Sequence, residues 1–395
     1  MKVWLIGTGC GVATLTRQAA AALEQAELLI GAKRLLETVP GCRCRTAAEY
    51  RPRAVLELLE KEAPERACIL LSGDAGFYSG AAGLLPLLQD RGYDVEVLPG
   101  ISSLQYFAAK LQRPWQDWQL CSAHGAACDA VYAVMQGNPV FFLTSGSDGP
   151  GTLCGALTEA GLGDIPVTVG ESLGLPGERI TSCIAAECAG ISYASLNVLL
   201  AEPAPVYPRR TPGIPDEEFL RDKIPMTKQE VRAAALSKLA VGPEDVCWDV
   251  GAGTGSVSVE LALQARQVWA AEQKPEALEL ARKNRERFLA WNLHLVEGTA
   301  PEVLESFPKP DAVFVGGSDG HLEEILTKID QTNPEAGICV SAIALETLQK
   351  AARTLGAQGR QVEITQIAVS RAEAAGTLHL MKAQNPVFLI TGVRT

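Results

Sequence analysis

Between residues 247 and 256 the chain reads Cys247-Trp248-Asp249-Val250-Gly251-Ala252-Gly253-Thr254-Gly255-Ser256. This short apolar run breaks into three alternating glycines, and the residues up to Leu261 then have the apolar periodicity of a helix start. Glycines at alternate positions let the backbone adopt positive φ and leave no Cβ between the main chain and a ligand. The segment therefore predicts a strand, a tight turn and a helix, with a small molecule bound at the turn.

The spacing of these glycines distinguishes between two kinds of cofactor. Dinucleotide-binding loops read G-x-G-x-x-G, and their last glycine packs the helix against the strand. Here the third glycine comes one residue early, at Gly255, and Ser256 stands where an NAD-dependent oxidoreductase would need glycine. The D-x-G-x-G-x-G form, led by Asp249, resembles the first motif of class I S-adenosylmethionine-dependent methyltransferases.

A second strand supports a cofactor at this turn. The apolar run 267–271 ends in Glu272, about 20 residues beyond Gly251, where an acidic group can accept hydrogen bonds from ribose hydroxyls. The simpler interpretation is an ordinary glycine turn followed by a surface glutamate. The leading Asp249 and the spaced Glu272 favour the cofactor site.

Length and composition set the class of protein. The 395 residues exceed the roughly 250–300 that one core usually reaches, so two domains are expected. With 47% hydrophobic and 21% charged residues, the chain has the composition of a soluble globular protein. The net charge of -11 argues against a nucleic-acid partner, because phosphate contacts need a basic face. No apolar stretch approaches the roughly 20 residues that span a bilayer, so no membrane partner is expected.

The cysteines and histidines indicate neither disulfides nor a metal site. The eleven cysteines form no C-x-x-C pair, and several, such as Cys68, Cys121, Cys247 and Cys339, lie in apolar runs. The first residues lead straight into a predicted strand and show no signal-peptide pattern. We therefore expect reduced thiols and a cytoplasmic protein. The four histidines do not have the spacing of metal ligands, so no metal is expected.

The N-terminal half repeats one pattern, in which an apolar strand closes in a glycine turn and a helix follows. Strands alternating with helices predict a mostly parallel sheet that binds ligands outside the carboxyl ends of its strands. The expected strands of this half lie at 3–6, 26–30, 68–71, 95–98, 118–122, 140–144, 166–170 and 196–201.

A proline-rich segment divides the chain. Five prolines between Glu202 and Pro215 predict a stiff linker over 203–215, which separates domains 1–202 and 216–395. Thr227 and Glu230 then have the spacing of a capping box that would open a helix. About seven strands are expected in the second domain, at 246–250, 268–271, 293–296, 312–315, 338–343, 361–369 and 386–391.

The glycine turns of the first half carry a family resemblance. The segments 7–11, 72–80 and 98–103 together resemble the tetrapyrrole (corrin/porphyrin) methylases, and the run from Ser103 to Gly125 is similar to the branch that methylates C-5 of a precorrin ring. This resemblance implies a first domain made of two α/β subdomains.

The second half resembles another enzyme of the same pathway. Its segments 224–232, 248–255 and 313–317 are similar to decarboxylating C-15 methyltransferases with a Rossmann-like class I fold. In this order, the two halves resemble the bifunctional precorrin-6Y C-5,15-methyltransferases of cobalamin biosynthesis. The resemblance implies S-adenosylmethionine as cofactor, methylation of a precorrin or cobalt-precorrin at C-5 and C-15, loss of the ring C acetate carboxylate, and a homo-oligomer.

The same resemblance implies two cofactor sites. In the first domain it places Gly73, Asp74 and Ala75 at the methionine end and Ser102, Ser103 and Thr144 around the rest, with residues 7–11 facing the tetrapyrrole. In the second domain the matching positions are Thr227, Gly251, Ala252, Gly253, Thr254, Gly255, Glu272 and Ala300. Turn chemistry alone would explain Asp74 and Ser102, and helix capping alone would explain Thr227.

No catalytic residue is assigned from the sequence. Methyl transfer is an in-line displacement by a ring carbon, so positioning and electrostatics should dominate. The substrate carries many carboxylates, so an acidic enzyme must concentrate positive charge at its cavities. The candidate cations are Arg113, Arg209, Arg210, Lys223, Lys228 and Arg232.

Two other functions remain open from the residues. The N-terminal domain could be a tetrapyrrole-binding module beside a catalytic C-terminal domain, because Cys10 and Val12 depart from the usual motif. An RNA or protein methyltransferase could use the same glycine turn, but the acidic charge and the absence of a stripe of aromatic and basic residues argue against it.

Overall fold

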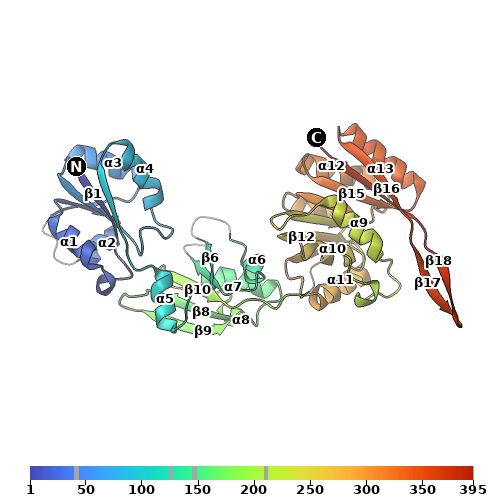
Figure 1. The fold of residues 1–395 in the computed structure, drawn as a ribbon, viewed down its shortest axis with the longest axis horizontal. Helices are drawn as coiled ribbons and strands as arrows, with labels where there is room; N and C mark the ends of the chain where they lie inside the picture. The colour runs from blue at the N-terminus through green and yellow to red at the C-terminus, as the bar shows by residue number, and fades with distance from the viewer. Residues whose placement is uncertain (40–43, 124–127, 145–148, 209–211, 395) are drawn as a thin grey trace. The chain divides into compact units, whose positions relative to one another are not determined.

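The chain folds into two compact units, Met1–Ala204 and Pro205–Thr395. The computed structural model describes residues 1–39, 44–123, 128–144, 149–208 and 212–394 (Figure 1). Among these residues, no helix is both long and apolar enough to cross a membrane. Each unit has its own sheets and its own hydrophobic clusters, so the site in each can be built from that unit alone.

The first sheet of the N-terminal unit is parallel throughout, in the order β3-β2-β4-β1-β5. Helices α3 and α4 cover one face and α1 and α2 the other (Figure 1). Val3 and Leu5 point to one face and Trp4 and Ile6 to the other, which is why β1 reads as a continuous apolar run. The elements are β1 (Lys2–Gly7), η1 (Val12–Thr14), α1 (Arg17–Gln25), β2 (Leu28–Gly31), α2 (Lys33–Thr38), β3 (Arg45–Ala48), α3 (Pro52–Glu62), β4 (Arg66–Leu71), α4 (Ala81–Asp90) and β5 (Asp94–Leu98).

The second sheet of this unit is mixed, in the order β6-β7-β10-β8-β9. Only β6 and β7 are parallel, and β10 pairs antiparallel with both β7 and β8. The two sheets make the two α/β subdomains that the resemblance implied. The elements are α5 (Ser103–Leu111), β6 (Gln119–Ser122), α6 (Ala130–Val134), β7 (Val140–Leu143), α7 (Pro150–Glu159), β8 (Pro166–Glu171), β9 (Arg179–Ile184), α8 (Ala185–Cys188) and β10 (Asn197–Ala201).

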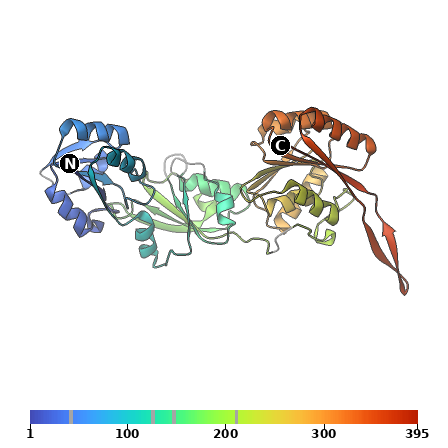
Figure 2. The same cartoon turned by 45° about the horizontal axis from the view of Figure 1, so that its top comes forward.

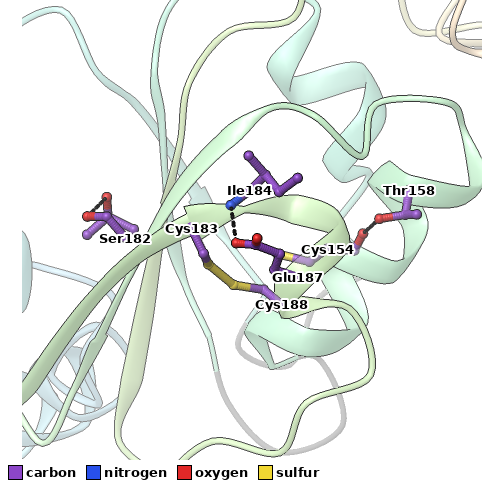
Figure 3. The surroundings of a disulfide bond; sticks show 8 residues. Cys154, Thr158, Ser182, Cys183, Ile184, Glu187 and Cys188 are labelled. Atoms are coloured by element: carbon purple, nitrogen blue, oxygen red, sulfur yellow. Dashed lines mark hydrogen bonds between the residues drawn. A yellow bond between two sulfur atoms is a disulfide. The ribbon is translucent and has the colours of Figure 1, made fainter.

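Among the described residues of this unit, Cys44, Cys121, Cys128, Cys183 and Cys188 are disulfide-bonded, so the expectation of reduced thiols is wrong for them. Cys121 bonds to Cys128, and Cys183 at the end of β9 bonds to Cys188 at the end of α8. Figure 3 shows the second bond, with Glu187 accepting a hydrogen bond of 3.4 Å from the Ile184 amide beside it. The sequence spacings of seven and five residues do not by themselves signal these two bonds. Cys68, Cys154, Cys247 and Cys339 are buried free thiols.

The C-terminal unit contains the expected seven-stranded sheet, in the order β13-β12-β11-β14-β15-β19-β16. The strands from β13 to β15 are parallel, and β19 pairs antiparallel with β15 and β16. Helices α12 and α13 cover one face, and α9, α10 and α11 cover the other (Figure 1). The elements are η2 (Asp216–Glu218), α9 (Gln229–Leu239), β11 (Val246–Val250), α10 (Ser256–Ala262), β12 (Gln267–Glu272), α11 (Pro275–Arg287), β13 (Leu293–Glu297), η3 (Glu302–Ser306), β14 (Ala312–Val315), α12 (Leu322–Thr332), β15 (Gly337–Ala342), α13 (Leu345–Ala357), β16 (Gln361–Ile367) and β19 (Val387–Val393).

Two further strands of this unit form a separate antiparallel ribbon, β17 (Ser370–Ala375) and β18 (Leu378–Ala383). The ribbon extends away from the seven-stranded sheet of its own unit in both views (Figure 1, Figure 2). Every residue of β18 is exposed, including Leu378, Leu380 and Met381.

A buried ion network fixes the start of the C-terminal unit. The Arg232 side chain is fully buried, and its guanidinium contacts Asp216 and Glu260 at 2.9 Å each. It also donates to the carbonyl oxygens of Thr227 and Ile214. Because an unpaired buried charge is costly, these contacts hold the segment 213–228 in one position.

The predicted capping box at the start of α9 is wrong. Lys228 is the N-cap residue and its side chain makes no capping bond. The Gln229 amide donates instead to Asp216 Oδ1, at 2.9 Å. Asp216, which is distant in the sequence, thus provides the hydrogen-bond acceptor that the local pattern assigned to Thr227. Thr227 instead lines a cavity.

Candidate active sites

Three glycine turns meet at the carboxyl end of the first sheet. The Gly9 amide donates to the Gly73 carbonyl at 3.0 Å, and the Gly73 amide donates to the Gly9 carbonyl at 3.1 Å. A Cβ on Gly100 would lie 2.2 Å from the Gly73 oxygen and 2.6 Å from the Gly7 oxygen. A side chain at position 100 would push the turns that follow β1, β4 and β5 apart, so glycine is required there.

These turns form one wall of a cavity of about 510 Å³ inside the N-terminal unit. The end of β2 and helix α2 form a second wall, and the second sheet forms a third, at Leu143 and Thr144 at the end of β7 and at residues 195–198 at the start of β10. Of the six residues predicted to hold a cofactor here, Gly73, Asp74, Ser103 and Thr144 line the cavity. Ala75 and Ser102 are buried beside it.

Asp74 and Ser102 have structural partners of their own. The two carboxylate oxygens of Asp74 accept hydrogen bonds from the amides of Gly76 and Gly100, at 2.8 and 2.9 Å. Ser102 caps α5 in a complete capping box with Gln105. The turn-chemistry interpretation therefore accounts for both residues, while leaving the Asp74 carboxylate at the cavity surface.

A second cavity, of about 590 Å³, lies in the C-terminal unit at the carboxyl ends of β11, β12 and β14. It is lined by seven of the eight residues predicted for this domain, namely Thr227, Gly251, Ala252, Gly253, Thr254, Glu272 and Ala300. The eighth, Gly255, is the N-cap of α10, and a Cβ there would lie 2.9 Å from Ala281 Cβ. This glycine therefore packs the helix, as the third glycine of such turns commonly does.

The turn itself has the features of a cofactor cradle. Gly251, Gly253 and Gly255 all have positive φ, at 77°, 58° and 75°. The Thr254 hydroxyl is buried and has no hydrogen-bond partner among the described residues, so a ligand in the cavity could use it. Glu272, 7% exposed, accepts hydrogen bonds from the amides of Gly253 and Lys274 at 2.8 and 2.9 Å. These residues fit a nucleoside-containing cofactor whose ribose faces Glu272.

Asp249 lies in β11, two residues before the first glycine of this turn. Its side chain is 1% exposed, Oδ2 accepts a hydrogen bond from the Ser258 hydroxyl, and Oδ1 has no partner among the described residues. Burial raises the pKa of this carboxyl to about 7, although the Ser258 hydrogen bond acts in the opposite direction. Asp249 does not line the cavity, so its role is in the fold rather than in ligand contact.

We expect Asp249 to make the stability of the C-terminal unit depend on pH. Its pKa is higher in the folded than in the unfolded state, so its contribution is complete below about pH 4 and is lost as the pH rises through about 7. Across this range the free energy of unfolding of the parent should fall by roughly 2–4 kcal/mol relative to Asp249→Asn. Urea titrations at several pH values would measure the difference, and parallel pH profiles would contradict the assignment.

Of the four expected substrate-facing cations that the structure describes, three do not line a cavity. Arg113 pairs with Glu202 at 2.5 Å, and Arg232 is enclosed in the buried network described above. Lys223 lines neither cavity, and Arg209 and Arg210 lie outside the described residues. Lys228 lines the second cavity as expected.

Sequence reasoning missed two cations that do line the cavities. Arg34 of α2 lines the first and Lys274 the second. Lys274 lies two residues after Glu272, the last residue of β12, and could have been found from that position. No motif marks Arg34, because its place at the cavity depends on β2 lying next to β4 in the sheet.

Comparisons with known proteins match both units. Residues 2–189 match the family described as Tetrapyrrole (Corrin/Porphyrin) Methylases, and residues 217–394 match the Precorrin methyltransferase domain. A relative from Sinorhizobium sp., named Precorrin-6Y C(5,15)-methyltransferase (decarboxylating), is 33% identical over 337 residues, which is 81% of this chain and 80% of that protein.

Shorter proteins are similar to part of the chain. A Sulfurisphaera tokodaii protein named Probable cobalt-precorrin-6B C(15)-methyltransferase (decarboxylating) is 41% identical over 189 residues, covering 46% of this chain and 98% of that protein. A crystal structure of a Geobacter metallireducens GS-15 protein titled Precorrin-6y C5,15-methyltransferase is 40% identical, covers 46% of this chain and 97% of that one, and has a TM-score of 0.44.

Proposed function

Because the chain belongs to the family of precorrin-6Y C5,15-methyltransferases (decarboxylating), we propose that its two units divide the two methylations between them. The chain is a methyltransferase of cobalamin biosynthesis, and its methyl donor is S-adenosylmethionine. In this proposal the unit 1–204 methylates C-5 of a precorrin. The unit 205–395 methylates C-15 and removes the carboxylate of the ring C acetate.

One observation carries this division of labour: each unit has a cavity of its own at the carboxyl ends of its parallel strands. The two volumes, about 510 and 590 Å³, are similar and lie in the range of small-molecule sites. In both cavities glycine turns bring bare backbone to the surface, which allows a ligand to approach closely.

We propose that the cofactor contacts the residues predicted from the sequence. In the first unit these are Gly73, Asp74, Ser103 and Thr144 at the cavity surface, with Ala75 and Ser102 supporting them from behind. In the second unit Glu272 takes the ribose, and Thr227 and the turn 251–254 enclose the rest of the molecule, with Ala300 at its edge.

The residues present suit methyl transfer by positioning. Bound S-adenosylmethionine supplies an electrophilic methyl group, so the protein needs to align it with a ring carbon and exclude water. Asp74 is held by two amides and Glu272 by two others, so both carboxylates are fixed in place before a ligand arrives. Fixed groups of this kind cost no reorganisation during the reaction.

Calorimetric titration of the full chain with S-adenosylhomocysteine tests the division. Two sites per chain are expected, one for each cavity. A single site would support the alternative in which the N-terminal unit only binds the tetrapyrrole. The alternative is not favoured, because the similarity to a C5,15-methyltransferase extends over 81% of this chain.

We also propose that the enzyme is a homo-oligomer that assembles through the ribbon β17–β18. Leu378, Leu380 and Met381 are 66%, 61% and 67% exposed, and in the described part of the chain both outer edges of the ribbon lack a partner strand. An exposed apolar edge pairs readily with an identical edge, which makes a second copy of the chain its natural partner. A nucleic-acid or membrane partner is not proposed, since the charge of -11 opposes both anionic surfaces.

Introducing three charges into the ribbon is expected to break the assembly. Leu378→Glu, Leu380→Glu and Met381→Glu together should reduce the mass measured by light scattering to about that of a single 41.9 kDa chain, because charges disfavour edge pairing. S-adenosylhomocysteine binding should be unchanged. Ile364→Glu, at a position on β16 that is 48% exposed, is the control and should leave the mass as in the parent. An unchanged mass in the triple variant would exclude the ribbon as the interface.

We propose a cytoplasmic enzyme. The buried free thiols Cys68, Cys154, Cys247 and Cys339 support this location. Oxidising compartments favour disulfides such as Cys121–Cys128 and Cys183–Cys188, so these two bonds argue against a cytoplasmic location. Cell fractionation, with thiol labelling before lysis, tests the proposal.

A further inference from the structure

The described lining of the first cavity contains a single side-chain cation. Among its described lining residues, Arg34 is the only lysine, arginine or histidine, and Asp74 is the only carboxylate. Asp74 already accepts two backbone hydrogen bonds, and Arg34 forms no ion pair with a described carboxylate. The guanidinium is therefore available to an anionic ligand in the cavity.

The position of Arg34 is separate from the glycine turns. Those turns follow β4, β1 and β5, whereas Arg34 follows β2, which lies on the other side of β4. The cavity extends from the turns to this side, where Ala32, Leu35, Thr38 and Val39 also line it. A ligand larger than the cofactor can thus reach Arg34 while the turns remain occupied.

The surroundings of Arg34 are mostly apolar and aromatic. Tyr50, Tyr78 and Val12 line the same cavity and are 74%, 53% and 53% exposed. Arg34 itself is exposed at the cavity, yet it loses enough solvent to lower the pKa of its guanidinium from the usual value. A cation in such a setting binds a carboxylate more strongly than a fully hydrated one does.

We infer that Arg34 binds a peripheral carboxylate of the precorrin and that Tyr50, Tyr78 and Val12 contact the face of its ring. This inference rests on the proposed C-5 methylation by the N-terminal unit. The ligand it requires has a flat apolar body and anionic edges, and one cavity contains both a cation and large apolar or aromatic side chains. Arg34 would set the orientation of the ring, and hence which carbon meets the methyl group.

The test compares Arg34→Gln and Arg34→Lys with Lys33→Gln, a neighbouring exposed position of α2 that does not line the cavity. For C-5 methylation, Arg34→Gln should raise KM for the precorrin roughly 10- to 100-fold, the range expected for losing a hydrogen bond to a charged group. Arg34→Lys should show a smaller rise in KM, because lysine keeps the positive charge but lacks the planar guanidinium that can bind a carboxylate through two hydrogen bonds. Lys33→Gln should behave as the parent.

Two further measurements separate orientation from structure. S-adenosylhomocysteine affinity at the first site and the rate of C-15 methylation should both be unchanged in Arg34→Gln. The parent KM should rise with salt more steeply than that of Arg34→Gln, because an exposed ion pair is screened. An unchanged KM in Arg34→Gln, or a loss of S-adenosylhomocysteine binding with it, would overturn the inference. A parent chain that does not methylate C-5 at all would instead refute the proposed function.

Discussion

Replacing Gly253 with arginine is expected to abolish methylation at C-15 and the accompanying decarboxylation, with a loss of about 100-fold or more. Gly253 has φ of 58° and lines the second cavity, and a Cβ there would lie 3.3 Å from the Pro225 carbonyl. A long side chain would therefore fill the space between the glycine turn and the segment 224–227. Calorimetry should then find only one S-adenosylhomocysteine site, the one in the N-terminal unit.

Gly359→Arg is the matched control for this variant. Gly359 also has positive φ, at 75°, but no atom lies within 4 Å of the added Cβ and the residue is outside the cavity. Both variants carry similar backbone strain, so a difference between them reports on the site. Two remaining S-adenosylhomocysteine sites in Gly253→Arg would show that the turn does not bind the cofactor.

The reciprocal variant, Gly73→Arg, is expected to abolish methylation at C-5, again by about 100-fold or more. Gly73 has φ of 64°, lines the first cavity and is hydrogen-bonded through its backbone to Gly9. Its Cβ would have room, at 3.6 Å from Ser102 Cα, so the rest of the arginine would enter the cavity rather than disrupt the turn. The S-adenosylhomocysteine site of the C-terminal unit should remain intact.

Gly92→Arg provides the control for Gly73→Arg within the same unit, because it has φ of 70° and open space around the added Cβ. Binding stoichiometry is the primary measurement, since it does not depend on the order of the two methylations. Mass spectrometry of products from a supplied precorrin gives the second. If Gly73→Arg kept both sites, the first cavity would be excluded as a cofactor site.

The sequence predicted the elements whose faces are buried. The five parallel strands of the C-terminal sheet, β11 to β15, were found because buried parallel strands read as apolar runs, and the glycine turns were found from the glycines that follow several such runs. Strands β3 and β17–β18 were missed, since most of their residues are exposed and no burial pattern marks them. Strand β9, a partly exposed edge strand, was missed in the same way.

Contacts between distant residues limited the prediction of the sites. Arg232 was expected to face a substrate, but its partners Asp216 and Glu260 are 16 and 28 residues away and enclose it completely. Arg34 was overlooked because only the order of the strands brings α2 to the first cavity. A glycine turn is a local sequence motif, so it could be predicted from the sequence. The role of a charged side chain depends on residues that only the fold brings next to it, so it could not.

The two units, which meet between Ala204 and Pro205, are parts of one polypeptide, and this fixes the relative amounts of the two activities. The similar protein from Sulfurisphaera tokodaii is 98% covered by less than half of this chain, so one such unit occurs alone. A cell with separate proteins must match two rates of synthesis and two rates of degradation. Translation of a single polypeptide produces both cavities in a ratio of one to one at every level of expression. A change in expression therefore cannot alter the ratio of the two activities.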